Sequence, residues 1–348
     1  MDAPPPPHPG NPPAKKARRS ERLAPLSAPP AAAPAPPAPL VRYRPALLGA
    51  LPPGEIFEGS LFEDVLTMGD GYIRCEVFSY LWQDEGLGLR AASRMCRDAI
   101  AQHPWGDFDD DYKHSHIIGE VSSWRACFPE AYAANIGGNK TVTDDDFEHL
   151  VGVSSLSMCG CDQTAITDVA FGHLECIDYL NMSGCNQNTI TSAAFAHLRG
   201  ISVLNMCYCA QATIADAAFA HLTGIHKLFM SFCQQESITD AAFAHLVGIH
   251  TLNMRWCDQA TITDAAFAHL AGIHTLNMSY CTQFTDAAFV HLQGIHTLTM
   301  EGCVQINNAA MEHLRGISVL DIRGCPQITA ASRKMLRTAN KKVEIITL

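Results

Sequence analysis

Residues 248–257 read GIHTLNMRWC, and residues 272–281 repeat them almost letter for letter as GIHTLNMSYC. Related strings recur through the last two-thirds of the chain, and a cysteine ends each of them. These cysteines stand at Cys161, Cys185, Cys209, Cys233, Cys257, Cys281, Cys303 and Cys325, first 24 residues apart and then 22 apart. A period of this length is typical of a solenoid, in which each unit is stable only when it stacks on its neighbours.

Each unit predicts a short strand followed by a short helix. In the unit that begins at Ile249, Leu252 and Met254 alternate in the manner of a strand and face inward. Thr263 and Asp264 then suit a helix start, because threonine can cap the first turn and aspartate complements the positive end of a helix.

This order of apolar positions, cysteine and helix resembles the leucine-rich repeat of the cysteine-containing kind, over residues 131–348. The resemblance implies an α/β solenoid with a parallel concave sheet and short convex helices. It also implies that each cysteine is a buried turn residue that satisfies backbone groups, in the place where other leucine-rich repeats carry asparagine. Asn139 stands in that place in an N-terminal capping copy over residues 131–139, and residues 343–346 are expected to form a closing strand.

The start of the chain has a different composition. Seventeen of the 20 prolines lie before residue 54, so residues 1–53 cannot bury a core and are expected to be disordered. The KKARR cluster at Lys15–Arg19 is either a nuclear import signal or a solvated run of charge. With no apolar signal-peptide core and no membrane-spanning stretch, we expect a cytoplasmic or nuclear protein whose cysteines are thiols.

The distribution of charge indicates which class of ligand the protein binds. The net charge is −11, and residues 1–45 hold seven basic and two acidic residues, which leaves −16 for the remainder. An acidic body argues against nucleic acid as the main ligand. No motif for a cofactor, a metal site or a nucleophile–base pair is found, so neither an enzyme nor a cofactor is expected.

Residues 61–105 have a helical pattern, and residues 76–100 read EVFSYLWQDEGLGLRAASRMCRDAI. This stretch resembles an F-box, the helical module that docks onto the Skp-type adaptor of cullin ubiquitin ligases. The resemblance implies adaptor contacts by Val77, Phe78, Leu81, Leu89, Arg90, Arg94 and Ile100.

Two features depart from the F-box pattern: Gly69-Asp70 replaces the usual Leu-Pro opening, and Gly86 stands at a normally apolar position. The alternative is a plain helical cap that shields the open end of the solenoid. Residues 106–130 are expected to be a connector with a short helix around Trp124 and Phe128.

A patterned departure from repetition marks a candidate target-binding surface. The residue just before the cysteine is Gly160, Gly184, Gly302 or Gly324 in the flanking repeats, but Tyr208, Phe232, Trp256 or Tyr280 in the middle ones. With Lys227, Phe229 and Arg255 on the non-core face, this aromatic row is similar to the anchors of protein-binding surfaces. The alternative is that the rings fold into the turn and complete the core, because this position has inward parity.

Two rows of histidine are given a structural interpretation. One row ends the helices, at His149, His173, His197, His221, His245, His269, His291 and His313, where histidine can bond free helix carbonyls. A second set, His226, His250, His274 and His296, starts the strands and is interpreted in the same way.

The sequence therefore predicts a substrate-recognition subunit of a Skp–cullin–F-box type ubiquitin ligase. Its expected partners are the Skp-type adaptor, the cullin ligase and a protein target held on the concave face. The alternative is a stand-alone leucine-rich-repeat scaffold that binds a protein without any role in ubiquitin chemistry.

Overall fold

The structure, a computed structural model, describes residues 90, 94–103, 105, 117 and 119–347. The chain forms two units, residues 1–52 and 53–348, and every described residue lies in the second. The predicted disordered segment and most of the F-box-like segment therefore lie outside the described residues.

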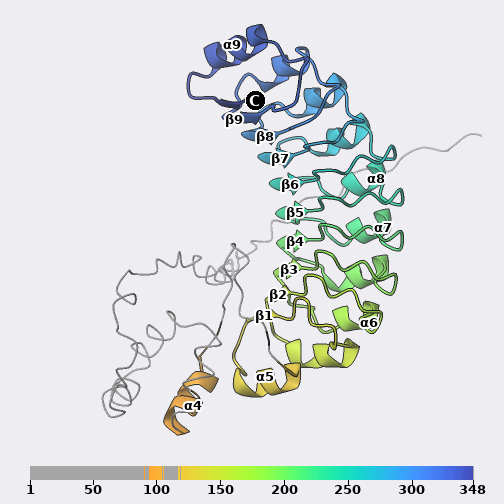
Figure 1. The fold of residues 1–348 in the computed structure, drawn as a ribbon, viewed down its shortest axis with the longest axis vertical. Coiled ribbons are helices and arrows are strands. Elements are labelled where there is room, and N and C mark those ends of the chain that lie inside the picture. The colour runs from red at the N-terminus through yellow and green to blue at the C-terminus, as the bar shows by residue number, and fades with distance from the viewer. Residues whose placement is uncertain (1–89, 91–93, 104, 106–116, 118, 348) are drawn as a thin grey trace, which may run out of the picture. The chain divides into compact units, whose positions relative to one another are not determined.

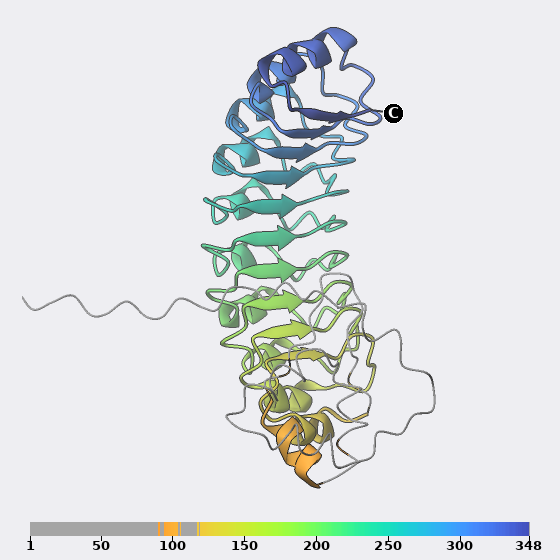
Figure 2. The same cartoon turned by 90° about the vertical axis from the view of Figure 1, so that its left-hand side faces the viewer.

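Ten short parallel strands form one sheet, and their order in the sheet is their order in the chain (Figures 1 and 2). The register places the same position of successive repeats side by side, as in Leu228, Leu252 and Leu276. The strands are β1 Ala133–Asn135, β2 Ser155–Ser157, β3 Tyr179–Asn181, β4 Val203–Asn205, β5 Lys227–Phe229, β6 Thr251–Asn253, β7 Thr275–Asn277, β8 Thr297–Thr299, β9 Val319–Asp321 and β10 Glu344–Ile346. The predicted leucine-rich-repeat solenoid is confirmed, including its first and last strands.

Short helices follow the strands and lie along the opposite side of the repeat body, with the strands on the inner side of its curve (Figure 1). Several are 3₁₀ rather than α helices, which suits segments this short. Two helices, α4 Arg94–Ala101 and α5 Val121–Cys127, precede the first strand. The helices that follow strands are η2 Asp144–Leu150, α6 Asp168–Phe171, η3 Ser192–His197, α7 Asp216–Phe219, α8 Asp240–Phe243, η4 Asp264–His269, η5 Asp286–His291, η6 Ala310–Leu314 and α9 Ala330–Ala339.

The core is a set of side-chain columns that run through the stack. Leu252, Met254, Cys257 and Phe267 are all fully buried, and their counterparts in the neighbouring repeats are buried with them. Each repeat therefore covers the apolar residues of the next one, which explains why no unit needs a core of its own.

The cysteines form the buried ladder that the resemblance implies. The Sγ of Cys257 donates to the carbonyl oxygen of Met230 in the preceding repeat at 3.0 Å, and Gln259 donates to the Cys233 carbonyl at 3.1 Å. Burial raises the pKa of the Cys257 thiol to about 12, so the thiol stays protonated and can donate this hydrogen bond.

A second ladder joins the helix starts. The carboxylate of Asp240 accepts hydrogen bonds from both the backbone N–H and the hydroxyl of Thr263 in the next repeat, each at 2.7 Å. Thr263 in turn caps its own helix by accepting from Ala265 N–H at 3.2 Å. The aspartates, expected to complement their own helix, thus also link each helix to its neighbour.

The N-terminal end of the sheet is closed by residues that precede the repeats. The Trp105 carbonyl accepts from the N–H groups of Tyr132 and Ala133 at 2.9 and 3.3 Å, and its indole is buried. Arg125 in α5, on the predicted connector helix, donates to several carbonyls, including that of His149 at 2.7 Å and that of Ala131 at 2.9 Å. These contacts anchor the cap to the first repeat.

The core columns predict the cost of truncation. Leu252→Ala should lower the free energy of unfolding by about 2–5 kcal/mol, because the packed repeats on both sides cannot close the gap. Urea denaturation followed by circular dichroism measures this loss. Val247→Ala, at a side chain that is 63% exposed, is the control and should change stability by less than about 0.5 kcal/mol. Equal losses in the two variants would contradict the columnar core.

Candidate protein-binding surface

The four aromatic residues just before the cysteines lie in turns, where their backbone is in the left-handed conformation. The φ angles of Tyr208, Phe232, Trp256 and Tyr280 are 60°, 60°, 59° and 61°, and these are the non-glycine residues with positive φ in the described part of the chain. The glycines of the flanking repeats have similar angles, from 67° to 73°. Glycine adopts this conformation freely, whereas a side chain there costs roughly 1 kcal/mol.

This conformation takes the rings out of the core. Tyr208 is 54% exposed, and Phe232, Trp256 and Tyr280 are half-buried. The alternative that these four rings complete the core is therefore wrong. It assumed that side chains alternate between inside and outside, which holds only for extended backbone, whereas these residues are left-handed. The middle repeats thus accept strain without gaining core packing.

The rings instead stack on one another in a four-membered ladder. The centroids of Tyr208 and Phe232 lie 4.5 Å apart, those of Phe232 and Trp256 6.0 Å, and those of Trp256 and Tyr280 4.4 Å. The interplanar angles are 9°, 20° and 1°, so all four rings are nearly parallel. Stacking offsets part of the backbone strain, since such pairs contribute about 0.5–1.5 kcal/mol each.

One end of the ladder is closed by the protein itself. The Tyr280 hydroxyl donates to Oε1 of Glu301 at 2.8 Å, and the guanidinium of Arg255 lies 4.5 Å from the Tyr280 ring centre. Arg255 also donates to Oε2 of Glu301 at 3.1 Å. A Cβ atom at Gly302 would lie 2.6 Å from the Tyr280 ring, so glycine is required there both for its φ of 72° and for space.

Charges at this end are mutually paired. The hydrogen bonds from the Tyr280 hydroxyl and then from Arg255 lower the pKa of Glu301. The bond to Glu301 also raises the pKa of Tyr280. Arg323 extends the network, with ion pairs to Asp321 at 2.7 Å and to Glu301 at 3.5 Å. The two arginines thus have carboxylate partners, and Arg255 is held in place against the ladder.

Phe229 breaks a second regular feature of the strand face. At the equivalent position, the side-chain oxygens of Asn205, Asn253 and Asn277 each accept the backbone N–H two residues on, at 3.0–3.2 Å. Phe229 pairs in register with Asn205 and Asn253 but cannot accept this bond. Its half-buried ring therefore replaces a turn-stabilising amide in the middle of the sheet.

Lys227 begins the same strand, β5. Its side chain is exposed and has no ion pair or side-chain hydrogen bond within the described residues. Together, the seven predicted target contacts lie on strands β4–β7 and in the turns that follow them, so the structure brings them onto one face.

The histidines at the strand starts form a column that the sequence interpretation missed. The rings of His226, His250, His274 and His296 stack with centroids 4.6, 4.5 and 4.5 Å apart. Nδ1 of His250, His274 and His296 lies 3.1 Å from the hydroxyl of the following threonine, not at a helix carbonyl. Desolvation, followed by the neighbouring His250 and His296, lowers the pKa of His274, which favours the neutral form of His274 near pH 7.

The histidines at the helix ends are half-buried, as expected of structural residues. No ring hydrogen bond to a helix carbonyl joins them within the part of the chain that the structure describes. The carbonyl-bonding interpretation of both histidine rows is therefore wrong, although their regular spacing still argues against a single metal or catalytic site.

The predicted adaptor contacts are only partly within the described residues. Val77, Phe78, Leu81 and Leu89 lie outside them, as does the side chain of Arg94 in α4. Arg90 is half-buried and donates to the Cys127 carbonyl at 3.3 Å. Ile100 is fully buried and its side chain packs in the core, so its predicted contact with an adaptor remains a prediction.

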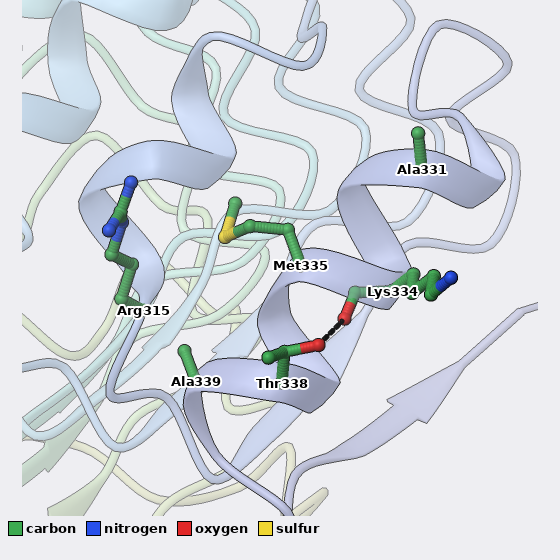
Figure 3. Close-up of a pocket in the computed structure, with 6 residues that line it drawn as sticks. All are labelled: Arg315, Ala331, Lys334, Met335, Thr338 and Ala339. Atoms are coloured by element: carbon green, nitrogen blue, oxygen red, sulfur yellow. Dashed lines mark hydrogen bonds between the residues drawn. The ribbon is translucent and has the colours of Figure 1, made fainter.

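The described residues were also searched for metal sites, membrane-spanning helices and pockets. They contain no cluster of three or more histidine, cysteine, aspartate or glutamate side chains placed to hold a metal ion. Among them, no helix is long and apolar enough to cross a membrane. A shallow hollow of about 500 Å³ lies on α9 and is lined by Arg315, Ala331, Lys334, Met335, Thr338 and Ala339 (Figure 3).

The pairing of Glu301 predicts a pH-dependent contribution to stability. Its pKa is lowered in the folded state, so the contribution is complete above the ordinary value of 4.5 and is lost as the pH falls through the folded pKa. Glu301→Gln should therefore lower the free energy of unfolding at pH 7 by less than about 1 kcal/mol, because solvent screens the pairs. Urea denaturation at pH 7 and pH 3 compares the two proteins. A difference that is the same at both pH values would contradict a contribution from the charge.

The chain is similar in fold to several solved structures. No protein-family model matches the chain, and no curated protein matches it. Solved structures of similar fold include a chain of the Rad7–Elc1 complex of yeast, with 14% identity, a TM-score of 0.43 and coverage of 65% of this chain and 70% of that one. A chain of the TLR13–ssRNA13 complex has 17% identity and a TM-score of 0.51, covering 64% of this chain and 33% of that one.

A chain of the Toll–Spatzle complex of Drosophila has 14% identity and a TM-score of 0.48, covering 73% of this chain and 38% of that one. The chain thus spans about a third of the length of the TLR13 chain and 38% of that of the Toll chain, and identities this low concern the fold alone. Ten in-register strands, eight in-phase cysteines and the similarity to the TLR13 chain lead to one conclusion: the chain has the leucine-rich-repeat fold.

Proposed function

We propose that this leucine-rich-repeat protein is a receptor that holds a protein target on its strand face. The contacts are the seven residues on β4–β7 and their turns: Tyr208, Lys227, Phe229, Phe232, Arg255, Trp256 and Tyr280. The observation that carries the proposal is the set of four aromatic residues in a left-handed conformation, outside the core, at a position where other repeats have glycine.

The energetics favour a binding role for this surface. The left-handed position is less strained with glycine, and Phe229 gives up a hydrogen bond that asparagine makes in neighbouring repeats. Core packing does not compensate either cost, since these rings are exposed or half-buried. Aromatic and arginine side chains are the usual anchors of protein interfaces, because they bury large areas at low entropic cost.

The finer form of the proposal is a substrate-recognition subunit of a Skp–cullin–F-box type ubiquitin ligase. It is supported by the F-box-like sequence that ends just before the repeats. The last part of that segment is tied to the first repeat through the buried Trp105, whose carbonyl pairs with Tyr132 and Ala133. Such a receptor acts by tethering: it raises the effective concentration of the target near the conjugating enzyme.

The alternative is a protein-binding scaffold with no role in ubiquitin chemistry. The burial of Ile100 and the hydrogen bond from Arg90 to Cys127 favour it, because these two residues help to hold the cap rather than face a partner. Both forms place the target on the same strand face, so they differ only in what the N-terminal segment binds.

Affinity capture with matched variants tests the strand face. Phe229→Asn and Trp256→Gly should each reduce recovery of the target at least about tenfold, since interface anchors contribute about 2 kcal/mol or more. Phe229→Asn installs the residue of the neighbouring repeats, and Trp256→Gly installs the residue of the flanking repeats, so each should change the free energy of unfolding by no more than about 1 kcal/mol. Quantitative mass spectrometry of the recovered proteins and urea denaturation measure the two effects.

Val247→Ser, at an exposed valine outside the strand face, is the control and should recover the target like wild type. If Phe229→Asn and Trp256→Gly remain folded and recover every protein that wild type recovers, the strand face is not the binding surface.

Binding to a purified Skp-type adaptor–cullin complex tests the ligase role. Wild type should recover the adaptor, and the double variant Phe78→Ala, Leu81→Ala should lose it, because the F-box resemblance assigns both residues to the adaptor contact. Phe229→Asn is the control and should retain the adaptor. Recovery by wild type no greater than by the double variant would remove the ligase role and leave the scaffold.

A further inference from the structure

The two ends of the aromatic ladder differ. At the Tyr280 end, the ring packs on Gly302 and beside Arg255, and its hydroxyl is bonded to Glu301. At the Tyr208 end, the ring stacks only on Phe232 among the described residues. Tyr208 is 54% exposed, and no hydrogen bond of its hydroxyl is found there.

No side chain stands at the ladder position on this side of Tyr208. The two preceding repeats have Gly184 and Gly160 at this position, with φ angles of 73° and 70°. A Cβ atom at Gly184 would contact only the Gly160 backbone, at 3.7 Å, and a Cβ at Gly160 would have no neighbour within 4 Å. The exposed Tyr208 ring therefore lies next to a bare strip of glycine backbone.

The charged groups beside this strip are paired with each other: the Lys140 ammonium donates to the Gly160 carbonyl at 2.6 Å and forms an ion pair with Asp162. Ser183 stands just before Gly184, and its hydroxyl donates to the Cys159 Sγ at 3.1 Å. Asp178 accepts a hydrogen bond from the Ser202 hydroxyl.

These surroundings select among planar groups. At the closed end, the charge of Arg255 is neutralised by Glu301. A guanidinium on Tyr208 would find Asp162 already paired with Lys140, and the phosphate of a nucleotide would find Lys140 already paired with Asp162. A neutral ring needs neither, and stacked rings already continue the ladder on the other face of Tyr208.

We propose that Tyr208, Gly184 and Gly160 form a stacking site for one neutral aromatic side chain of the protein target, which continues the ladder as a fifth ring. The inference rests on the proposed function, because it names the anchor by which a target would engage the strand face. The partner is a protein segment that presents an exposed phenylalanine, tyrosine or tryptophan.

Ligand-observed NMR with N-acetyltryptophanamide tests the site on the full chain. The probe should bind at millimolar concentration, and Tyr208→Ala should weaken binding roughly five- to tenfold through loss of the stacked ring. Gly184→Tyr should abolish it, because the new ring occupies the site; the φ of 73° at Gly184 is close to the 60° that Tyr208 adopts. Gly138→Tyr is the matched control: Gly138 has a φ of 68° and open space, but Gly160 and Gly184 separate its repeat from Tyr208.

Three further probes test whether the site prefers a neutral aromatic ring. N-acetylleucinamide should bind at least about fivefold more weakly than the tryptophan probe, since it is apolar but not planar. Tighter binding of N-acetylargininamide or of adenosine monophosphate at the same site would overturn the assignment in favour of a cation or a nucleobase. Binding of the tryptophan probe that is unchanged in both Tyr208→Ala and Gly184→Tyr would also overturn it.

Capture of the target separates this inference from the proposed function. Proteins that are lost with Phe229→Asn should also be lost with Gly184→Tyr and retained with Gly138→Tyr. If Gly184→Tyr recovers them like wild type, the stacking site is not the anchor, although the strand face still binds the target. If Phe229→Asn and Trp256→Gly lose nothing, the proposed function itself is contradicted.

Discussion

The turn at the end of each strand is the constraint on which the rest of the structure depends. A left-handed residue reverses the chain, and the buried cysteine that follows donates its thiol hydrogen to a carbonyl of the preceding repeat, as Cys257 does to Met230. The turn therefore fixes both the direction of the chain and the distance to the neighbouring repeat. The in-register strands and the aspartate–threonine links at the helix starts repeat that spacing on either side of the core.

The same turn gives the protein its distinctive surface. A left-handed residue sends its side chain away from the core, so substitution of glycine there adds a ring to the surface and leaves the core unchanged. Because the turns are stacked, four such rings come within stacking distance of one another. The strain of each is partly offset by its neighbours, which explains how a feature that costs the fold stability persists in four consecutive repeats.

Much of the fold could be predicted from the chain because a solenoid repeats local interactions. The period fixed the strands, the terminal copies and the burial of the cysteines, since each depends on residues at constant spacing. The orientation of Tyr208 or Trp256 could not be predicted in this way, because strand parity assigns them to the core. The signal was present in the glycines of the flanking repeats: alternation of glycine with large residues at a turn indicates a positive φ.

The sequence by itself determined the leucine-rich repeat, the row of aromatic residues and the break at Phe229. The tertiary structure decided that the rings stack outside the core, that the histidines at the strand starts form a column, and that Ile100 is buried. It also showed that the two ends of the ladder differ, although the sequence has a tyrosine at both, Tyr208 and Tyr280. The physical reason is that Tyr280 is closed by Gly302, Arg255 and Glu301, whereas Tyr208 faces bare glycine backbone, and these contacts form only when the repeats stack.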